Sequence, residues 1–221
     1  MPRGFYTDDR GRVRPVAGGG GRSRSALLAG LIALSAVGYG GAVGLSAGGS
    51  GGGGGPGLGV EARKAESGDF ARRGDADGAW RRMGLHGLKR TEKQQAACVD
   101  AAFGGVREFL RETACTSMER VLFTVGDDAG NSAVIAVAWV VFDSRGDAQE
   151  FQDIMDAPGT GDVKALGTAQ VGLADVAFTG ANYGSDRDRT TVTVAEAEIA
   201  TGYLTPEVLD ALAEVAAQLP R

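Results

Sequence analysis

Histidine and cysteine are nearly absent from this sequence, which holds one histidine and two cysteines in 221 residues. Zinc sites are built from several histidine, cysteine and acidic ligands, so we expect no metal centre. The single histidine, His86, has no acidic or thiol neighbour in sequence, which makes it a poor base for an acyl-transfer triad. Cys98 and Cys115 lack the Cys-x-x-Cys spacing of redox-active pairs. We therefore expect no catalytic residues and no cofactor, and a surface or docking role for His86.

Basic charge is scarce outside the N-terminus. The formal net charge is −5, and residues 1–25 contribute six arginines against two aspartates, so the rest of the chain carries −9. Proteins that bind nucleic acid present a basic surface. The acidic remainder therefore argues against nucleic acid as a partner.

Charged residues are missing from residues 26–47. A bilayer core requires roughly 20 apolar residues of helix, so this stretch predicts a single transmembrane helix, with the lipid bilayer as its partner. The arginines before it place the N-terminus in the cytoplasm and the C-terminal domain outside. A cleaved secretory signal is the alternative, although cleavage after Ala47 would put Leu45 where a small residue is required. Gly40 and Gly44 match a helix-dimerisation motif, which so glycine-rich a stretch also produces by chance.

Residues 48–88 lack the periodicity of helices and strands. Glycine dominates residues 48–59, as is typical of flexible tethers, and residues 61–84 are small and charged. One domain accounts for what remains. We predict a basic cytoplasmic tail at 1–25, a transmembrane helix at 26–47, a flexible linker at 48–88 and an extracytoplasmic domain at 89–221.

Periodic segments begin near residue 91. Apolar residues spaced three and four apart predict a helix over 91–112, and alternation predicts a strand over 120–125. Residues 133–142 are apolar at nearly every position, which indicates a central strand covered on both sides. Ser144, with Asp147 three residues later, predicts the start of a second helix.

The last third of the chain predicts a weak strand at 163–166, a hairpin of 176–183 with 190–199, and a final helix that begins with Thr205 and Pro206. The predicted order is α-β-β-α-β-β-α, and its first six elements are a circular permutation of the ferredoxin-like order. We therefore predict an α+β fold. In it, an antiparallel sheet of four or five strands carries two helices on one face, and the C-terminal helix lies elsewhere.

One face of the predicted central strand is a candidate interaction face. If the first two helices cover the opposite face, this one needs the last helix or a second subunit. An uncovered apolar patch of that size would be a partner site, for a second copy or another envelope protein. The face consists of Ile135, Val137, Trp139 and Val141.

The two cysteines set two arguments against each other. An exported domain with two cysteines usually forms a disulfide, yet a straight helix would hold Cys98 and Cys115 roughly 22 Å apart, far beyond the 4.4–6.8 Å that a disulfide allows. Either the helix breaks at Gly104 and Gly105 and the disulfide forms, which we favour, or the thiols are free.

Four segments carry a resemblance: residues 95–103, 109–110, 115–118 and 137–143. Together with the anchor and glycine tether, they resemble a group of actinobacterial membrane-anchored or secreted proteins of unknown function, over roughly residues 89–220. The resemblance implies a cell-envelope setting in a Gram-positive actinobacterium and no particular chemistry.

Three functions remain open. The first is a non-catalytic envelope domain that binds or scaffolds other proteins, which the anchor, the tether and the apolar strand favour. The second is a small-ligand sensor or binding domain that acts through a partner. The third and least favoured is a hydrolase that pairs carboxylates for acid–base chemistry, with candidates Asp127, Asp128, Asp186, Asp188, Glu196 and Glu198.

Overall fold

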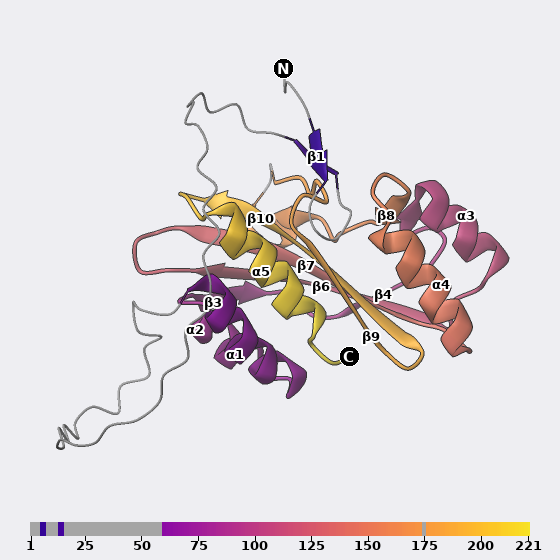
Figure 1. Ribbon diagram of the computed structural model, residues 1–221, viewed down its shortest axis with the longest axis horizontal. Helices are drawn as coiled ribbons and strands as arrows, with labels where there is room; N and C mark the ends of the chain where they lie inside the picture. The colour runs from indigo at the N-terminus through magenta and orange to yellow at the C-terminus, as the bar shows by residue number, and fades with distance from the viewer. Residues whose placement is uncertain (1–4, 8–12, 16–58, 174–175) are drawn as a thin grey trace, which may run out of the picture. The chain divides into compact units, whose positions relative to one another are not determined.

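The computed structural model describes residues 5–7, 13–15, 59–173 and 176–221 (Figure 1). Near the N-terminus, β1 (Phe5–Thr7) and β2 (Val13–Pro15) form a two-stranded antiparallel ribbon. The predicted transmembrane helix at 26–47 lies outside the described residues. Among those that are described, none of the helices combines the length and hydrophobicity needed to span a bilayer.

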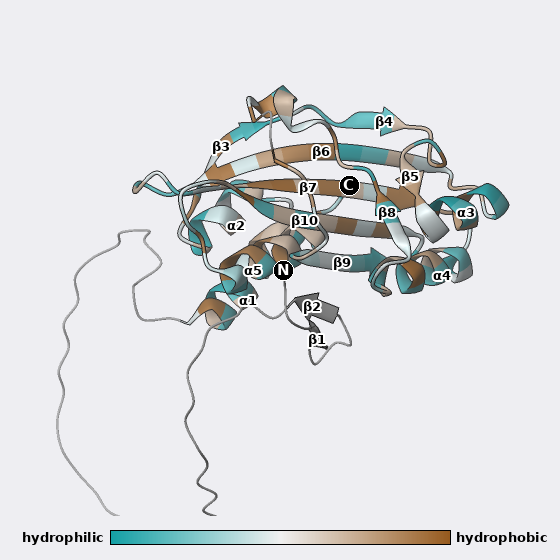
Figure 2. Cartoon of the chain, turned by 90° about the horizontal axis from the view of Figure 1, so that it is seen from above, coloured by the Kyte–Doolittle hydropathy of each residue, from teal (hydrophilic) through white to brown (hydrophobic). Residues whose placement is uncertain are grey.

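The centre of the folded domain is an antiparallel sheet with the strand order β3-β6-β7-β10-β9. A sixth strand, β4, pairs with β6 beyond the end of β3. Figure 2 shows the strands side by side, with hydrophobic residues along much of β7. The antiparallel α+β class is therefore confirmed. The strands are β3 (His86–Arg90), β4 (Gln94–Ala96), β6 (Ser117–Gly126), β7 (Ser132–Val141), β9 (Tyr183–Asp188) and β10 (Thr191–Thr201).

The β9–β10 hairpin differs from its prediction. The strand expected at 176–183 begins only at Tyr183, and most of the residues expected in the turn belong to β9. The real turn contains Arg189, which adopts a left-handed conformation with φ of 56°. Polar and charged residues are admissible in β9 because it is an edge strand, so its sequence did not show the apolar alternation of a strand.

Two helices, α3 (Gly104–Glu112) and α4 (Arg145–Asp156), pack on the same face of the sheet. Their aromatic residues Phe109 and Phe151 join Phe142 in one cluster. The predicted start of α4 is confirmed, because the Ser144 side chain accepts a hydrogen bond from the Asp147 backbone N–H at 3.1 Å.

The opposite face is covered by α5 (Pro206–Ala217) together with α1 (Val60–Arg72) and α2 (Ala76–Arg82). Ile135, Val137 and Trp139 are at most 2% exposed there, and the Trp139 indole donates a hydrogen bond to the Leu219 carbonyl at 2.8 Å. The predicted interaction face consisted of Ile135, Val137, Trp139 and Val141. The prediction is wrong for the first three, because they are buried. The C-terminal helix covers them, and only Val141, at the strand end, is partly exposed.

The segment predicted as linker is mostly part of the domain. Within 48–88, α1, α2 and the start of β3 are folded, and Trp80 is 1% exposed in the core. The sequence pattern did not indicate α1 because its buried residues are Ser67, Gly68 and Ala71 rather than large apolar ones. The hydroxyl of Ser67 donates to the Ala79 carbonyl of α2 at 2.7 Å, so small residues allow the two helices to pack closely.

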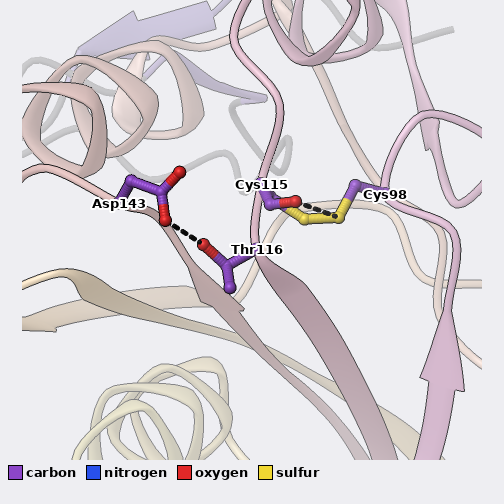
Figure 3. Close-up of a disulfide and its surroundings, with 4 residues drawn as sticks. All are labelled: Cys98, Cys115, Thr116 and Asp143. Carbon is purple, nitrogen blue, oxygen red and sulfur yellow. Dashed lines mark hydrogen bonds between the residues drawn. A yellow bond between two sulfur atoms is a disulfide. The ribbon is translucent and has the colours of Figure 1, made fainter.

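The predicted helix over 91–112 is wrong in its first half. Those residues form β4, a turn and the short β5 (Ala102–Phe103), and the helix begins only at Gly104, whose φ is 62°. Because Cys98 lies outside the helix, its Cα comes within 6.3 Å of the Cys115 Cα, and the two residues form a disulfide (Figure 3). The preference for the disulfide over free thiols is confirmed.

The weak strand expected at 163–166 is found slightly earlier as β8 (Gly161–Val163). It pairs with β5 rather than with the main sheet. A short 3-10 helix, η1 (Thr168–Val171), comes after it. The β5–β8 ribbon brings Asp162 close to the central strands of the sheet.

Candidate functional site

A small cavity lies on the α3–α4 face of the sheet, between the strands and the segment that begins at β8. Its lining comes from β6, β7, β9 and β10 and from residues 162–166. The cavity volume is about 20 Å³, which is room for a water molecule. Sites for drug-sized ligands measure about 300–1,000 Å³, so in this conformation the cavity suits water and not a larger molecule. The polar or charged residues that line it are Arg120, Asp162, Lys164, Tyr183 and Glu196.

Strand alternation places Glu196 in the cavity. Successive side chains of a strand point to opposite faces, so Glu196 shares its face of β10 with Val192 and Val194, which pack under α3 and α4. Glu196 is 9% exposed. A glutamate on the inward-facing side of an otherwise apolar strand is an uncommon placement, and this pattern is visible in the sequence.

Pairing between distant segments places Asp162 opposite Glu196. Asp162 lies in β8, and β8 is held by its antiparallel pairing with β5, in which Phe103 is the partner of Asp162. The Lys164 backbone N–H also donates to the Ala101 carbonyl at 2.7 Å. These contacts join the segment before α3 to the segment after α4, and they hold β8 beside the sheet.

The two acidic side chains form a hydrogen bond with each other. Such a bond requires a proton on one of them, because two carboxylates have only acceptors. Glu196 Oε2 also accepts from the Gly180 backbone N–H at 2.8 Å, and Asp162 Oδ1 accepts from the Val163 backbone N–H at 2.6 Å. With one proton between them, the pair is a carboxylic acid and a carboxylate, of which Glu196 is buried and Asp162 is partly exposed.

Burial raises the pKa of Glu196 to about 8, and the negative charge of Asp162 adds to this effect. Burial also raises the pKa of Asp162, against the opposing hydrogen bonds from Glu196 and Val163. The two groups titrate as a unit. Near neutral pH the pair accordingly retains a proton that an exposed glutamate would have lost.

Two cations line the same cavity, and both are engaged with backbone carbonyls. Arg120 Nη1 donates to the Lys164 carbonyl at 2.8 Å, and Lys164 Nζ donates to the Asp100 carbonyl at 2.8 Å. Burial lowers the pKa of Arg120. Among the described residues, no ion pair joins Arg120 or Lys164 to either acid.

Tyr183 closes the cavity on the β9 side. Its hydroxyl donates to Asp156 Oδ1 of α4 at 3.2 Å, and Ser185 Oγ donates to the same oxygen at 2.7 Å. Burial raises the pKa of Tyr183 well above its ordinary value, and the charges of Asp156 and Asp162 act in the same direction. The phenol therefore stays neutral, and its O–H remains a hydrogen-bond donor to Asp156.

Most of the carboxylates proposed from the sequence for acid–base chemistry do not form a pair with a second carboxylate in the structure. Asp127 accepts hydrogen bonds from the Ala129 and Asn131 backbone N–H groups, both at 2.9 Å, which is turn chemistry. Asp186 and Asp188 lie exposed on the edge strand β9. Glu198 accepts a hydrogen bond from the Thr179 backbone N–H at 3.0 Å. Of these candidates only Glu196 meets a second carboxyl group, and its partner Asp162 was not among them.

His86 lies at the domain surface. Its side chain is 48% exposed, and Nδ1 is 3.9 Å from Asp128 Oδ1, which is itself fully exposed. In the part of the chain that the structure describes, no three His, Cys, Asp or Glu side chains gather in a way that could hold a metal ion.

The cavity beside Glu196 thus offers a shared proton, a water-sized space and two nearby cations. Comparison with protein-family models, with curated proteins and with solved structures finds no significant match for this chain.

Proposed function

We propose that this chain is a single-pass membrane protein whose C-terminal domain lies outside the cell membrane and binds or scaffolds other envelope proteins without catalysis. The observation that carries the location is the Cys98–Cys115 disulfide, because disulfides persist in oxidising compartments. The uncharged stretch at 26–47 and the arginines before it support the same orientation. The resemblance to actinobacterial envelope proteins agrees with this setting.

The binding role rests on the outer surface of the domain. Both faces of the sheet are covered by helices and by the β8–η1 segment, so a partner has to contact the periphery. Leu88 and Tyr203 are 50% and 67% exposed. Both lie beside the β6–β7 turn, because the Leu88 side chain packs next to Gly126 and the Tyr203 backbone N–H donates to Asn131 Oδ1 at 2.9 Å. This end of the sheet is the proposed contact surface, for a second copy or another envelope protein.

A small-ligand binding domain is the second candidate. Five polar or charged residues converge on the cavity beside Glu196, which is the arrangement that ligand sites use for orientation. The cavity volume of about 20 Å³ limits the occupant to a molecule the size of water unless the cover moves. The protein-binding role is therefore the better supported of the two.

We also infer that the core of the domain is a permuted ferredoxin-like arrangement. Its support is the strand order β6-β7-β10-β9, with α3 before β6 and α4 between the two hairpins on one face. Circular permutation of β-α-β-β-α-β generates this order. The strand β3 and the helices α1, α2 and α5 are additions to it.

The location is tested by labelling intact cells with a membrane-impermeant maleimide, with and without a reductant. Labelling only after reduction is expected, because both cysteines lie in the disulfide. Labelling that requires permeabilisation of the membrane would place the domain in the cytoplasm and overturn the proposed orientation.

The binding role is tested with a photo-crosslinking amino acid at Tyr203 in the full-length protein in cells. Asp153 is the matched control, because it is exposed on α4 away from the proposed surface. We expect a discrete adduct from position 203 and none from position 153. Absence of an adduct at 203, or identical adducts from both positions, would contradict the proposed surface.

A further inference from the structure

The β8–η1 segment, residues 161–171, covers part of the sheet. Its residues Leu166 and Val171 are 6% and 4% exposed. They pack in one cluster with Leu122, Val134 and Ala136, which face them from β6 and β7. The segment therefore shields an apolar area that the helices α3 and α4 leave uncovered.

Pairing of β8 with β5 and hydrogen bonds that involve Lys164, Arg120 and Lys89 hold this segment to the rest of the domain, in addition to the apolar cluster. The hydrogen bond between Asp162 and Glu196 differs from these because it joins two acidic groups, so it is an attraction only while one of them carries a proton. Without that proton, two negative charges face each other beside the buried Glu196 side chain.

The charged and titratable groups around Glu196 determine how the contact responds when that proton is lost. Glu198 lies on the same face of β10, and its charge acts against ionisation of Glu196. The Tyr183 hydroxyl of β9 donates its hydrogen bond to Asp156 of α4. The two cations, Arg120 and Lys164, are bound to backbone carbonyls, and Gly180 contributes a single N–H at 2.8 Å. Among the described residues, neither cation forms an ion pair with Asp162 or Glu196.

We propose that the proton shared by Asp162 and Glu196 is a latch that holds the β8–η1 segment over the sheet. Loss of the proton in mildly alkaline solution repels Asp162 from Glu196 and loosens the segment. Loosening uncovers the apolar surface of Leu122, Val134 and Ala136 and enlarges the cavity. The proposal rests on the geometry of the segment and is independent of the partner-binding role.

The test is hydrogen–deuterium exchange of the full-length protein between pH 6 and 9.5. Rates for peptides within 161–171 are divided by the intrinsic exchange rate at each pH, and peptides from β7 serve as an internal control. In the wild-type protein we expect protection of the segment to fall at least tenfold across this range while β7 stays protected. The Glu196→Gln variant keeps a hydrogen bond to Asp162 without the ionisable group, so its segment is expected to remain protected throughout.

Glu198→Gln is the matched control, because it removes a neighbouring carboxylate from the same strand face and leaves Asp162 and Glu196 in place. It should keep the response of the wild type, with at most a small shift toward lower pH, because the charge of Glu198 is the smallest of the causes that raise the pKa of Glu196. Constant protection in the wild type would overturn the proposal, since it would mean that the segment stays in place whatever the protonation of the pair. Parallel loss in Glu196→Gln, or loss of the response in Glu198→Gln, would also overturn it. Carbon-13 NMR titration of the wild-type carboxyl groups gives a check that needs no variant, and a Glu196 midpoint near the ordinary value of about 4.3 would overturn it too.

Discussion

Gly184 shows how a single residue sets the distance between β9 and α5. A Cβ at this position would lie 2.7 Å from the Ala213 carbonyl oxygen and 2.6 Å from the Glu214 Cα. Both are backbone atoms of the helix, so they cannot give way as a flexible side chain would. We expect Gly184→Ala to lower the free energy of unfolding by about 1–3 kcal/mol, measured by urea denaturation.

Gly167→Ala is the control for that substitution. Gly167 has a φ of −62°, and a Cβ there would meet no atom within 4 Å. The alanine should change the unfolding free energy by less than about 1 kcal/mol. Any change should be an increase, because alanine restricts the conformations of the unfolded chain. Equal losses in the two variants would contradict the steric explanation.

Glu196 makes the stability of the domain depend on pH. Because its pKa is raised to about 8 in the folded protein, the folded state holds a proton that the unfolded state has lost above pH of about 4.3. Stability is therefore expected to fall as pH rises from about 5 to 8, with a contribution of up to about 1.4 kcal/mol per pH unit. Urea denaturation at several pH values should show this slope in the wild type and in Glu198→Gln, and a smaller slope in Glu196→Gln. If the slope of Glu196→Gln equalled that of the wild type, groups other than Glu196 would be responsible for the pH dependence of stability.

At the scale of the element, the segments that could be predicted are those whose apolar residues follow a clear period. β7 is apolar at every position after Ser132, and α4 and α5 begin at strong N-terminal signals, Ser144 and Thr205 with Pro206. The helix α1 buries Ser67, Gly68 and Ala71, so its contact face has no hydrophobic stripe. Conversely, the helical spacing of residues 98–103 continued into α3 in the sequence, but the left-handed Gly104 and the pairing of β5 with β8 end it there.

The candidate site was predictable only in part for a related reason. Glu196 can be found from the sequence because alternation puts it on the same face as Val192 and Val194. Asp162 cannot, since it reaches Glu196 through the pairing of β8 with β5, whose partners Phe103 and Asp162 are far apart in the chain. Local periodicity carries no information about such a contact.

The Cys98–Cys115 disulfide ties the irregular segment before α3 to the start of β6. It closes a loop of 17 residues, for which the reduction of unfolded-state entropy is worth about 3 kcal/mol. We expect the Cys98→Ala/Cys115→Ala variant to lose a similar amount of unfolding free energy, measured by urea denaturation. Wild-type protein under a reductant is the control and should show the same loss. A variant as stable as the oxidised protein would show that the bond does not constrain the unfolded chain.

At the scale of the whole molecule, the domain begins well before residue 89, where the sequence pattern placed its start. The helices α1 and α2 and the residues up to β3 contribute Trp80, Met83 and Leu85 to the core, each at most 4% exposed. Trp80 packs edge-on against Phe123 of β6, with 5.7 Å between ring centroids, and Lys64 of α1 pairs with Glu214 of α5 at 2.9 Å. The face of the sheet under α5 is therefore completed only by these N-terminal elements.

This boundary predicts different behaviour for two fragments. Residues 59–221 retain α1 and α2 and should unfold cooperatively, with a melting temperature close to that of the full chain. Residues 89–221, the domain expected from the sequence pattern, lose three large buried side chains, each worth about 1.5–3 kcal/mol, from a total stability that is typically about 5–15 kcal/mol. We expect this shorter fragment to aggregate or to melt without cooperativity, as measured by circular dichroism and size-exclusion chromatography. A cooperative melt of 89–221 at the temperature of 59–221 would mean that α1 and α2 dock on a core that is already complete. In that case the surface that they cover on the sheet, which includes Phe123, would be a candidate site for a partner.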